Sequence, residues 1–173
     1  MFRTPIDLAY VKRPLKERYG TNAVAFDTLL DPDWDRSIDL FPGMAVRLTS
    51  SDNTLADDFV QVVDTADEVV FGLLGLYVAP AYGIDEVRDQ GINAVPVWQL
   101  NPGVEYEVNS ESFVTGATWT STPGTPLYVA AVVSGANQGK LTPHVAATTT
   151  AAFARLVSKD ANTIIITGLQ GTV

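Results

Sequence analysis

The chain has 173 residues, of which 46% are hydrophobic and 18% charged, and its formal net charge is −9. A domain of this length buries roughly 70% of the surface that its unfolded chain exposes, so it can fold without stabilising disulfides or metal ions. The absence of cysteine excludes disulfides, thiolate metal sites and cysteine nucleophiles. The acidic balance argues against nucleic acid as the main partner, and the longest apolar run, 69–80, is shorter than the roughly 20 residues that span a bilayer, so we expect no membrane partner.

Basic residues concentrate at the N-terminus, where the first 20 residues hold five of the eleven bases but only two of the twenty acids. The apolar residues of this segment follow neither helical nor strand periodicity, and no apolar core of a secretory signal follows its basic residues. We predict an extended basic arm over 1–20, a β domain over 21–173, and binding of the arm to a neighbouring subunit. The candidate contact residues of the arm are Phe2, Arg3, Ile6, Leu8, Tyr10, Lys12, Arg13, Lys16 and Arg18.

Three Pro-Gly dipeptides, at 42–43, 102–103 and 123–124, each precede a stretch rich in strand-forming residues. Proline sets φ near −65° at the second position of a type II turn, and glycine accepts the positive φ required at the third. They predict turns that lead into strands at 44–48, 104–108 and 127–133.

Two of the predicted strands differ in their hydrophobic pattern. In 104–108, valine and tyrosine alternate with two glutamates, which predicts a strand with one buried face and one exposed face. In 164–166, three consecutive isoleucines predict a strand that is covered on both faces.

Further stretches are rich in β-branched and aromatic residues, and together they predict about eight or nine short strands. This number of strands, separated by turn signals, indicates an all-β fold, a compact β-sandwich or barrel. One segment, 84–90, has acidic residues in its first turn and a glycine after its end, which indicates a short helix. The segment 146–152 is low in complexity, and we expect an exposed strand or a loop there. The remaining predicted strands are 59–63, 69–78, 94–98, 113–118, 153–157 and 163–169.

The sequence contains no complete set of catalytic or metal-binding residues. His144 is the only histidine, and it follows a proline, so we expect a loop residue without catalytic partners. The sequence Asp-Thr-Ala at 64–66 is similar to the Asp-Thr-Gly loop of dimeric aspartic proteases, but alanine replaces the glycine. We therefore predict no enzymatic activity, no catalytic residues and no cofactor.

Four carboxylates, those of Asp31, Asp33, Asp35 and Asp39, begin like a calcium-binding loop. Arg36 and Pro42 stand where an EF-hand needs glycine and glutamate, so that motif is excluded. We predict no metal site, and whether these aspartates bind a cation stays open. The aromatic residues, Trp34, Trp98 and Trp119 among them, could form a sugar-binding platform, although their spacing favours core positions.

Five segments together resemble the head decoration, or capsid cement, proteins of tailed bacteriophages. They are 41–46, 70–73, 103–108, 153–156 and 164–168, which contain an opening Gly-x-x-Val strand, a central glycine followed by an apolar residue, a Gly-Val-x-Tyr strand and a closing apolar strand. The resemblance covers roughly residues 40–170. The chain departs from the pattern in its basic arm and over 79–100.

The resemblance implies a structural virion protein that binds the major capsid protein on the outer surface of the head and clamps neighbouring subunits. Because the N-terminus does not resemble a secretory signal, we expect assembly in the host cytoplasm. The resemblance also implies a homo-oligomer, a trimer or dimer, and the high apolar content agrees with self-association. The alternatives are another virion component, such as a tail-tube or head-completion subunit, and a β-sandwich carbohydrate-binding module.

Overall fold

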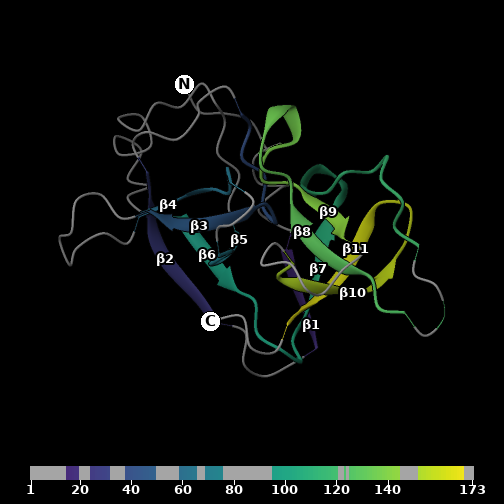
Figure 1. Ribbon diagram of the computed structural model, residues 1–173. Coiled ribbons are helices and arrows are strands. Elements are labelled where there is room, and N and C mark those ends of the chain that lie inside the picture. The colour runs from purple at the N-terminus through teal and green to yellow at the C-terminus, as the bar shows by residue number, and fades with distance from the viewer. Residues whose placement is uncertain are drawn as a thin grey trace, which may run out of the picture.

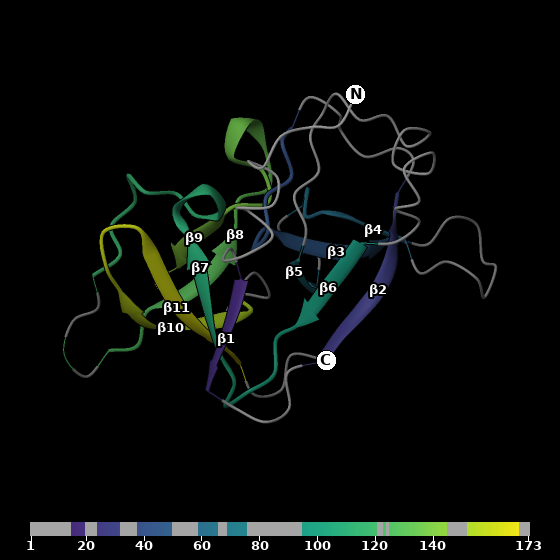
Figure 2. The same cartoon turned by 180° about the vertical axis from the view of Figure 1, so that it is seen from behind.

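The computed structural model describes residues 15–19, 24–31, 38–49, 59–65, 69–75, 95–120, 123, 125–144 and 152–169. Over these residues the protein is all-β, as the sequence predicts, and its strands run from β1 to β11 along the chain. Its helical segments there are the single 3-10 turns η1 (Ser110–Ser112) and η2 (Gly135–Asn137). The strands form two units, a barrel and an open sheet, which lie side by side in both views (Figures 1 and 2).

The barrel closes in the order β2-β4-β3-β5-β6, and β6 pairs with β2. The β2–β4 pairing is parallel and the other pairings are antiparallel. Closure leaves these strands without a free edge. The bounds are β2 (Val24–Leu30), β3 (Ala45–Thr49), β4 (Phe59–Val62), β5 (Gly72–Leu74) and β6 (Val95–Gln99).

The open sheet has six strands in the order β1-β7-β11-β10-β8-β9, and all its pairings are antiparallel. Strands β1 and β9 form its two edges, and β9 carries Pro143, which lacks the amide hydrogen that a central strand would donate. The bounds are β1 (Leu15–Tyr19), β7 (Glu105–Asn109), β8 (Tyr128–Ala131), β9 (Leu141–His144), β10 (Ala154–Lys159) and β11 (Thr163–Gly168).

Two apolar cores meet at the barrel wall. Val46 of β3 and Leu74 of β5 belong to the core inside the barrel. Their neighbours Ala45 and Leu73 belong to the core that includes Tyr106 and other residues of the open sheet. Because side chains alternate along a strand, β3 and β5 contribute to both cores, and the barrel packs against the sheet through an apolar layer.

The connection between β8 and β9 joins the sheet to the barrel. The backbone N–H of Ala45 donates to the carbonyl oxygen of Gly139 at 2.8 Å. A Cβ on Gly139 would overlap Cγ1 of Val62, and it would lie 2.9 Å from Cε of Met44. Glycine is therefore required here both by its φ of +78° and by the close approach of two barrel side chains.

The predicted Pro-Gly turns form where the structure describes them. The N–H of Met44 donates to the carbonyl of Phe41 at 3.1 Å, with Gly43 at φ 99°. The N–H of Val104 donates to the carbonyl of Asn101 at 3.2 Å, with Gly103 at φ 83°. Both have proline and then glycine at the central positions, as a type II turn requires. The third turn includes Gly124, which lies outside the described residues.

The alternation predicted for 104–108 is confirmed. Tyr106 and Val108 are fully buried, whereas Glu105 and Glu107 are partly exposed on the other face. The isoleucines at 164–166 are all buried, which confirms that β11 is covered on both faces. The predicted strands 44–48, 59–63, 94–98, 127–133, 153–157 and 163–169 all correspond to observed strands, with shifts at their ends.

The strand predicted over 113–118 is wrong. Phe113 makes one isolated bridge to Leu141, and the chain then turns instead of extending a ladder. The indole N–H of Trp119 donates to the carbonyl of Val114 at 2.8 Å, and the Trp119 ring meets that of Phe113 edge to face at 5.5 Å. The aromatic and β-branched residues of this segment therefore serve a compact turn and the core.

The sequence does not predict three of the strands, β1, β2 and β9. Charged residues interrupt β1, and β9 contains a proline and a histidine, so neither shows an apolar alternation. The predicted strand 69–78 is shortened to β5, at 72–74, within the described residues. The helix predicted at 84–90 and the segment 146–151 lie outside the residues that the structure describes.

Candidate functional site

Most of the predicted basic arm, residues 1–14, lies outside the described residues, and with it Phe2, Arg3, Ile6, Leu8, Tyr10, Lys12 and Arg13. The end of the arm does not project from the domain as an arm would. Lys16 and Arg18 lie on β1, whose backbone pairs with β7, with Leu15 opposite Val108 and Lys16 opposite Glu107. Residues 15–19 are therefore an edge strand of the open sheet.

His144 lies at the end of β9, partly buried and opposite Tyr128 in the β8–β9 ladder. It is on a strand, not in the loop that the preceding proline suggested. Within the described residues, no group of three histidine, aspartate or glutamate side chains is arranged to hold a metal ion. Asp31 and Asp39 are described, whereas Asp33 and Asp35 fall outside that part of the chain.

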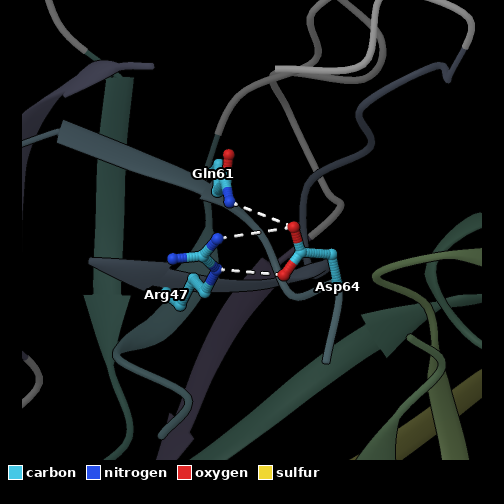
Figure 3. Close-up of polar contacts among 3 residues, drawn as sticks. All are labelled: Arg47, Gln61 and Asp64. Carbon is cyan, nitrogen blue, oxygen red and sulfur yellow. Dashed lines mark hydrogen bonds and ion pairs between the residues drawn. The ribbon is translucent and has the colours of Figure 1, made fainter. Parts of the chain in front are cut away.

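Asp64 is held in a polar cluster on the barrel surface with Arg47 of β3 and Gln61 of β4 (Figure 3). Its Oδ1 lies 3.3 Å from Nε of Arg47, and its Oδ2 accepts hydrogen bonds from Nη2 of Arg47 at 3.4 Å and Nε2 of Gln61 at 3.2 Å. In an aspartic protease the carboxylate would share a proton with a second carboxylate. Here it forms a surface ion pair, which contributes about 0.2–1 kcal/mol to stability.

The tryptophans that could form a sugar platform do not lie on the surface as one. Trp119 is 5% exposed and belongs to the core, and Trp98 packs against that core from β6. Trp34 lies outside the described residues. Tyr106 is also buried, and its hydroxyl donates to the carbonyl of Gln99 at 2.8 Å. The spacing that favoured core positions is confirmed for Trp98, Trp119 and Tyr106.

A row of polar residues crosses the outer face of the open sheet. Glu105 of β7 is opposite Thr167 of β11, Thr167 is opposite Arg155 of β10, and Arg155 is opposite Tyr128 of β8. Tyr128 is in turn opposite His144 of β9. Directly opposed residues in a ladder project to the same face, so the pairing of five strands aligns these side chains.

The row without His144 lies along a groove of about 420 Å³. Glu105, Tyr128, Arg155 and Thr167 line it, and Pro102 and Val157 are among its apolar walls. Val157 is 43% exposed because it is the extra residue in a bulge of β10, where Leu156 pairs with Ile166 and Ser158 with Ile165. The groove thus combines charged, hydroxyl and apolar surface.

The charged side chains of the groove form no hydrogen bond or ion pair with other described residues. Thr167 accepts a hydrogen bond from the N–H of Gly103 at 3.3 Å. The side chains of Glu105, Tyr128 and Arg155 have no hydrogen-bond or ion-pair partner in the structure as described. They are available to a ligand or a partner protein.

A second surface, at the barrel, is more apolar. Leu48 is 48% exposed and Val69 is 66% exposed, and both line a depression of about 250 Å³ with Phe71 and Arg47. Exposed apolar side chains of this kind occur where proteins contact one another. It lies next to the cluster of Asp64, so an ion pair borders the apolar surface.

The sequence did not indicate the groove on the open sheet. Its charged residues come from β7 and β10, about 50 positions apart, and only the strand order brings them to one face. Within each strand, the hydrophobic pattern does indicate that these residues are exposed, because they alternate with more buried residues along β7 and at the start of β10.

In the described part of the chain no helix has the length and apolar content to cross a membrane. The comparison with curated proteins gave no match. A family model described as phage cement protein matches residues 1–171, which is nearly the whole chain. The chain therefore belongs to the phage cement protein family, and it is a structural component of a phage capsid.

Proposed function

We propose that the protein binds the outer surface of the phage head, without enzymatic activity, and holds neighbouring capsid subunits together. The major capsid protein is the partner, the protein acts as a homo-oligomer, a trimer or dimer, and assembly takes place in the host cytoplasm. The observation that carries the proposal is the family match over 1–171. The all-β body with two linked cores supports it, because a clamp must resist deformation between the subunits that it joins.

The N-terminal arm is the strap of this clamp. Residues 15–19 are hydrogen-bonded to β7, so the strap comprises residues 1–14, with Phe2, Arg3, Ile6, Leu8, Tyr10, Lys12 and Arg13 as its contact residues. It starts from β1, an edge strand of the sheet. At about 3.3 Å per extended residue it could reach on the order of 45 Å, enough to cross onto another subunit.

Burial of apolar side chains contributes more to this contact than charge does. An exposed ion pair contributes about 0.2–1 kcal/mol, whereas full burial of a large apolar side chain contributes about 1.5–3 kcal/mol. Salt should therefore weaken attachment only modestly, since it screens the charges and not the apolar contact.

Co-sedimentation with shells that lack the native protein tests the proposal. Full-length protein is compared with a chain that begins at Pro14, which keeps all of β1. We expect the shorter chain to remain folded and to lose most of its occupancy. Equal occupancy of the two chains would refute the strap, and absence of binding by the full-length chain would refute the capsid role.

A further inference from the structure

The groove on the open sheet sets a specific demand on any occupant. Glu105 and Arg155 are separated by one intervening strand, so their Cα atoms lie about 10 Å apart at about 4.8 Å per strand. Neither has an ion-pair partner among the described residues. An occupant that satisfies both must carry a cationic and an anionic group at about this separation, with apolar surface beside the anionic group to contact Val157, which lies two residues along β10 from Arg155.

The N-terminal strap carries such a pattern. Arg3 and Asp7 are four residues apart, about 13 Å in an extended chain, and Ile6 stands between them. Arginine side chains are long enough to adjust this separation to that of the groove. Asp7 is the only acid among residues 1–14, where the bases are Arg3, Lys12 and Arg13.

Charge also favours a second copy of the chain as the source of the strap. Residues 15–173 contain eight bases and nineteen of the twenty acids, so two bodies repel each other. A segment with three bases and one acid, inserted between two bodies, offsets this repulsion. The net positive charge of the strap of one copy therefore complements the net negative charge of the body of another.

The direction of β1 argues against insertion into the groove of the same copy. Leu15 is opposite Val108 and Tyr19 is opposite Glu105, so the chain enters β1 at the end of the sheet away from the groove residue Glu105. A strap would have to reverse its direction and return along the sheet to reach its own groove. The strap of a neighbour needs no such reversal.

We propose that the groove formed by Glu105, Tyr128, Arg155 and Val157 receives residues 1–14 of a second copy, with Arg3 at Glu105 and Asp7 at Arg155. This inference rests on the proposed strap and names the subunit that the strap binds. Tyr128 then supplies a hydroxyl and a ring face to the bound segment. Within the proposed trimer or dimer, each cement subunit then holds the next.

The test is a charge exchange, measured by analytical ultracentrifugation of the full chain at tens of micromolar without shells. We expect wild-type protein to self-associate, and Asp7→Arg or Arg155→Asp alone to weaken association about three- to tenfold, since each opposes like charges across the contact. The double variant should recover most of the wild-type affinity. Arg3→Glu and Glu105→Arg form a second, independent pair.

Lys159→Asp is the matched control. Lys159 is an exposed base on the same strand as Arg155, and it does not line the groove. Its reversal should change association by less than twofold. If it weakens association as much as Arg155→Asp, general charge and not the groove controls self-association, and the inference is wrong.

Other outcomes separate this inference from the proposed function. A monomeric wild-type chain, or a double variant as weak as the single ones, overturns the inference. If at the same time the chain beginning at Pro14 loses shell binding, the strap binds the shell directly and the capsid role stands. If the exchange restores association but the full-length chain does not bind shells, the groove contact is supported and the capsid role is wrong.

Discussion

The substitution Gly139→Ala tests the connection between the two cores. The residue has φ +78°, which costs an L-residue with a side chain roughly 1–2 kcal/mol. The added Cβ would overlap Val62 and lie 2.9 Å from Cε of Met44, and overpacking of this kind costs about 1–3 kcal/mol. The free energy of unfolding should therefore fall by about 2–5 kcal/mol.

Gly135→Ala, in the same β8–β9 connection, is the matched control. Gly135 has φ +77°, but a Cβ there would meet nothing within 4 Å. It should show the backbone cost alone, roughly 1–2 kcal/mol. The difference between the two variants isolates the packing of the connection against the barrel.

Urea unfolding followed by tryptophan fluorescence measures both variants. With a denaturant slope of about 2 kcal/mol per molar, the packing difference of about 1–3 kcal/mol moves the midpoint by about 0.5–1.5 M. Equal midpoints for Gly139→Ala and Gly135→Ala would refute the reasoning, because the two cores would then not meet through this glycine.

Three further outcomes are expected. A chain that begins at Thr21 lacks β1 and should show faster amide exchange along β7 than a chain that begins at Pro14; equal exchange would show that β1 does not protect β7. Ser112→Ala removes the hydrogen bond from the buried Ser112 hydroxyl to the carbonyl of Pro42, at 2.7 Å, and should lower the unfolding free energy measured in urea titrations by about 1–3 kcal/mol. An unchanged unfolding free energy would contradict a stabilising role for this hydrogen bond. The Asp160 carboxylate accepts hydrogen bonds from the N–H groups of Asn162 and Thr163 at 2.9 and 2.8 Å, and these bonds hold its pKa below 3.8. Because folding lowers this pKa, the ionised carboxylate stabilises the fold at pH values above the unfolded-state pKa, and this stabilisation is lost as the pH falls through the folded-state pKa. Thermal unfolding should therefore show Asp160→Asn less stable than wild type at pH 7, with a stability difference that shrinks in acid. A stability difference independent of pH would contradict this.

Local features of the fold could be predicted from the sequence because their causes are local. A Pro-Gly pair needs no distant partner to favour a type II turn, and both turns that the structure describes form as predicted, at Gly43 and Gly103. The alternation around Tyr106 identified the buried face of β7 in the same way, because side chains of a strand point in turn to opposite faces.

The strands that were not predicted have causes outside their own residues. β9 forms with Pro143 because it lies at an edge, where the missing amide hydrogen breaks no ladder bond. β1 forms at the opposite edge through its backbone pairing with β7. Conversely, the segment after Phe113 has strand-like composition but turns, and Trp119 packs against Phe113 instead.

The sequence alone thus determined the all-β class, the turns, the buried faces of β7 and β11, and the resemblance to cement proteins. The tertiary structure decided the division into barrel and sheet, the need for glycine at 139, and the groove that Glu105 and Arg155 line on either side of Thr167. The reason is that turns and alternation depend on neighbours along the chain, whereas strand order and close packing depend on residues far apart in it.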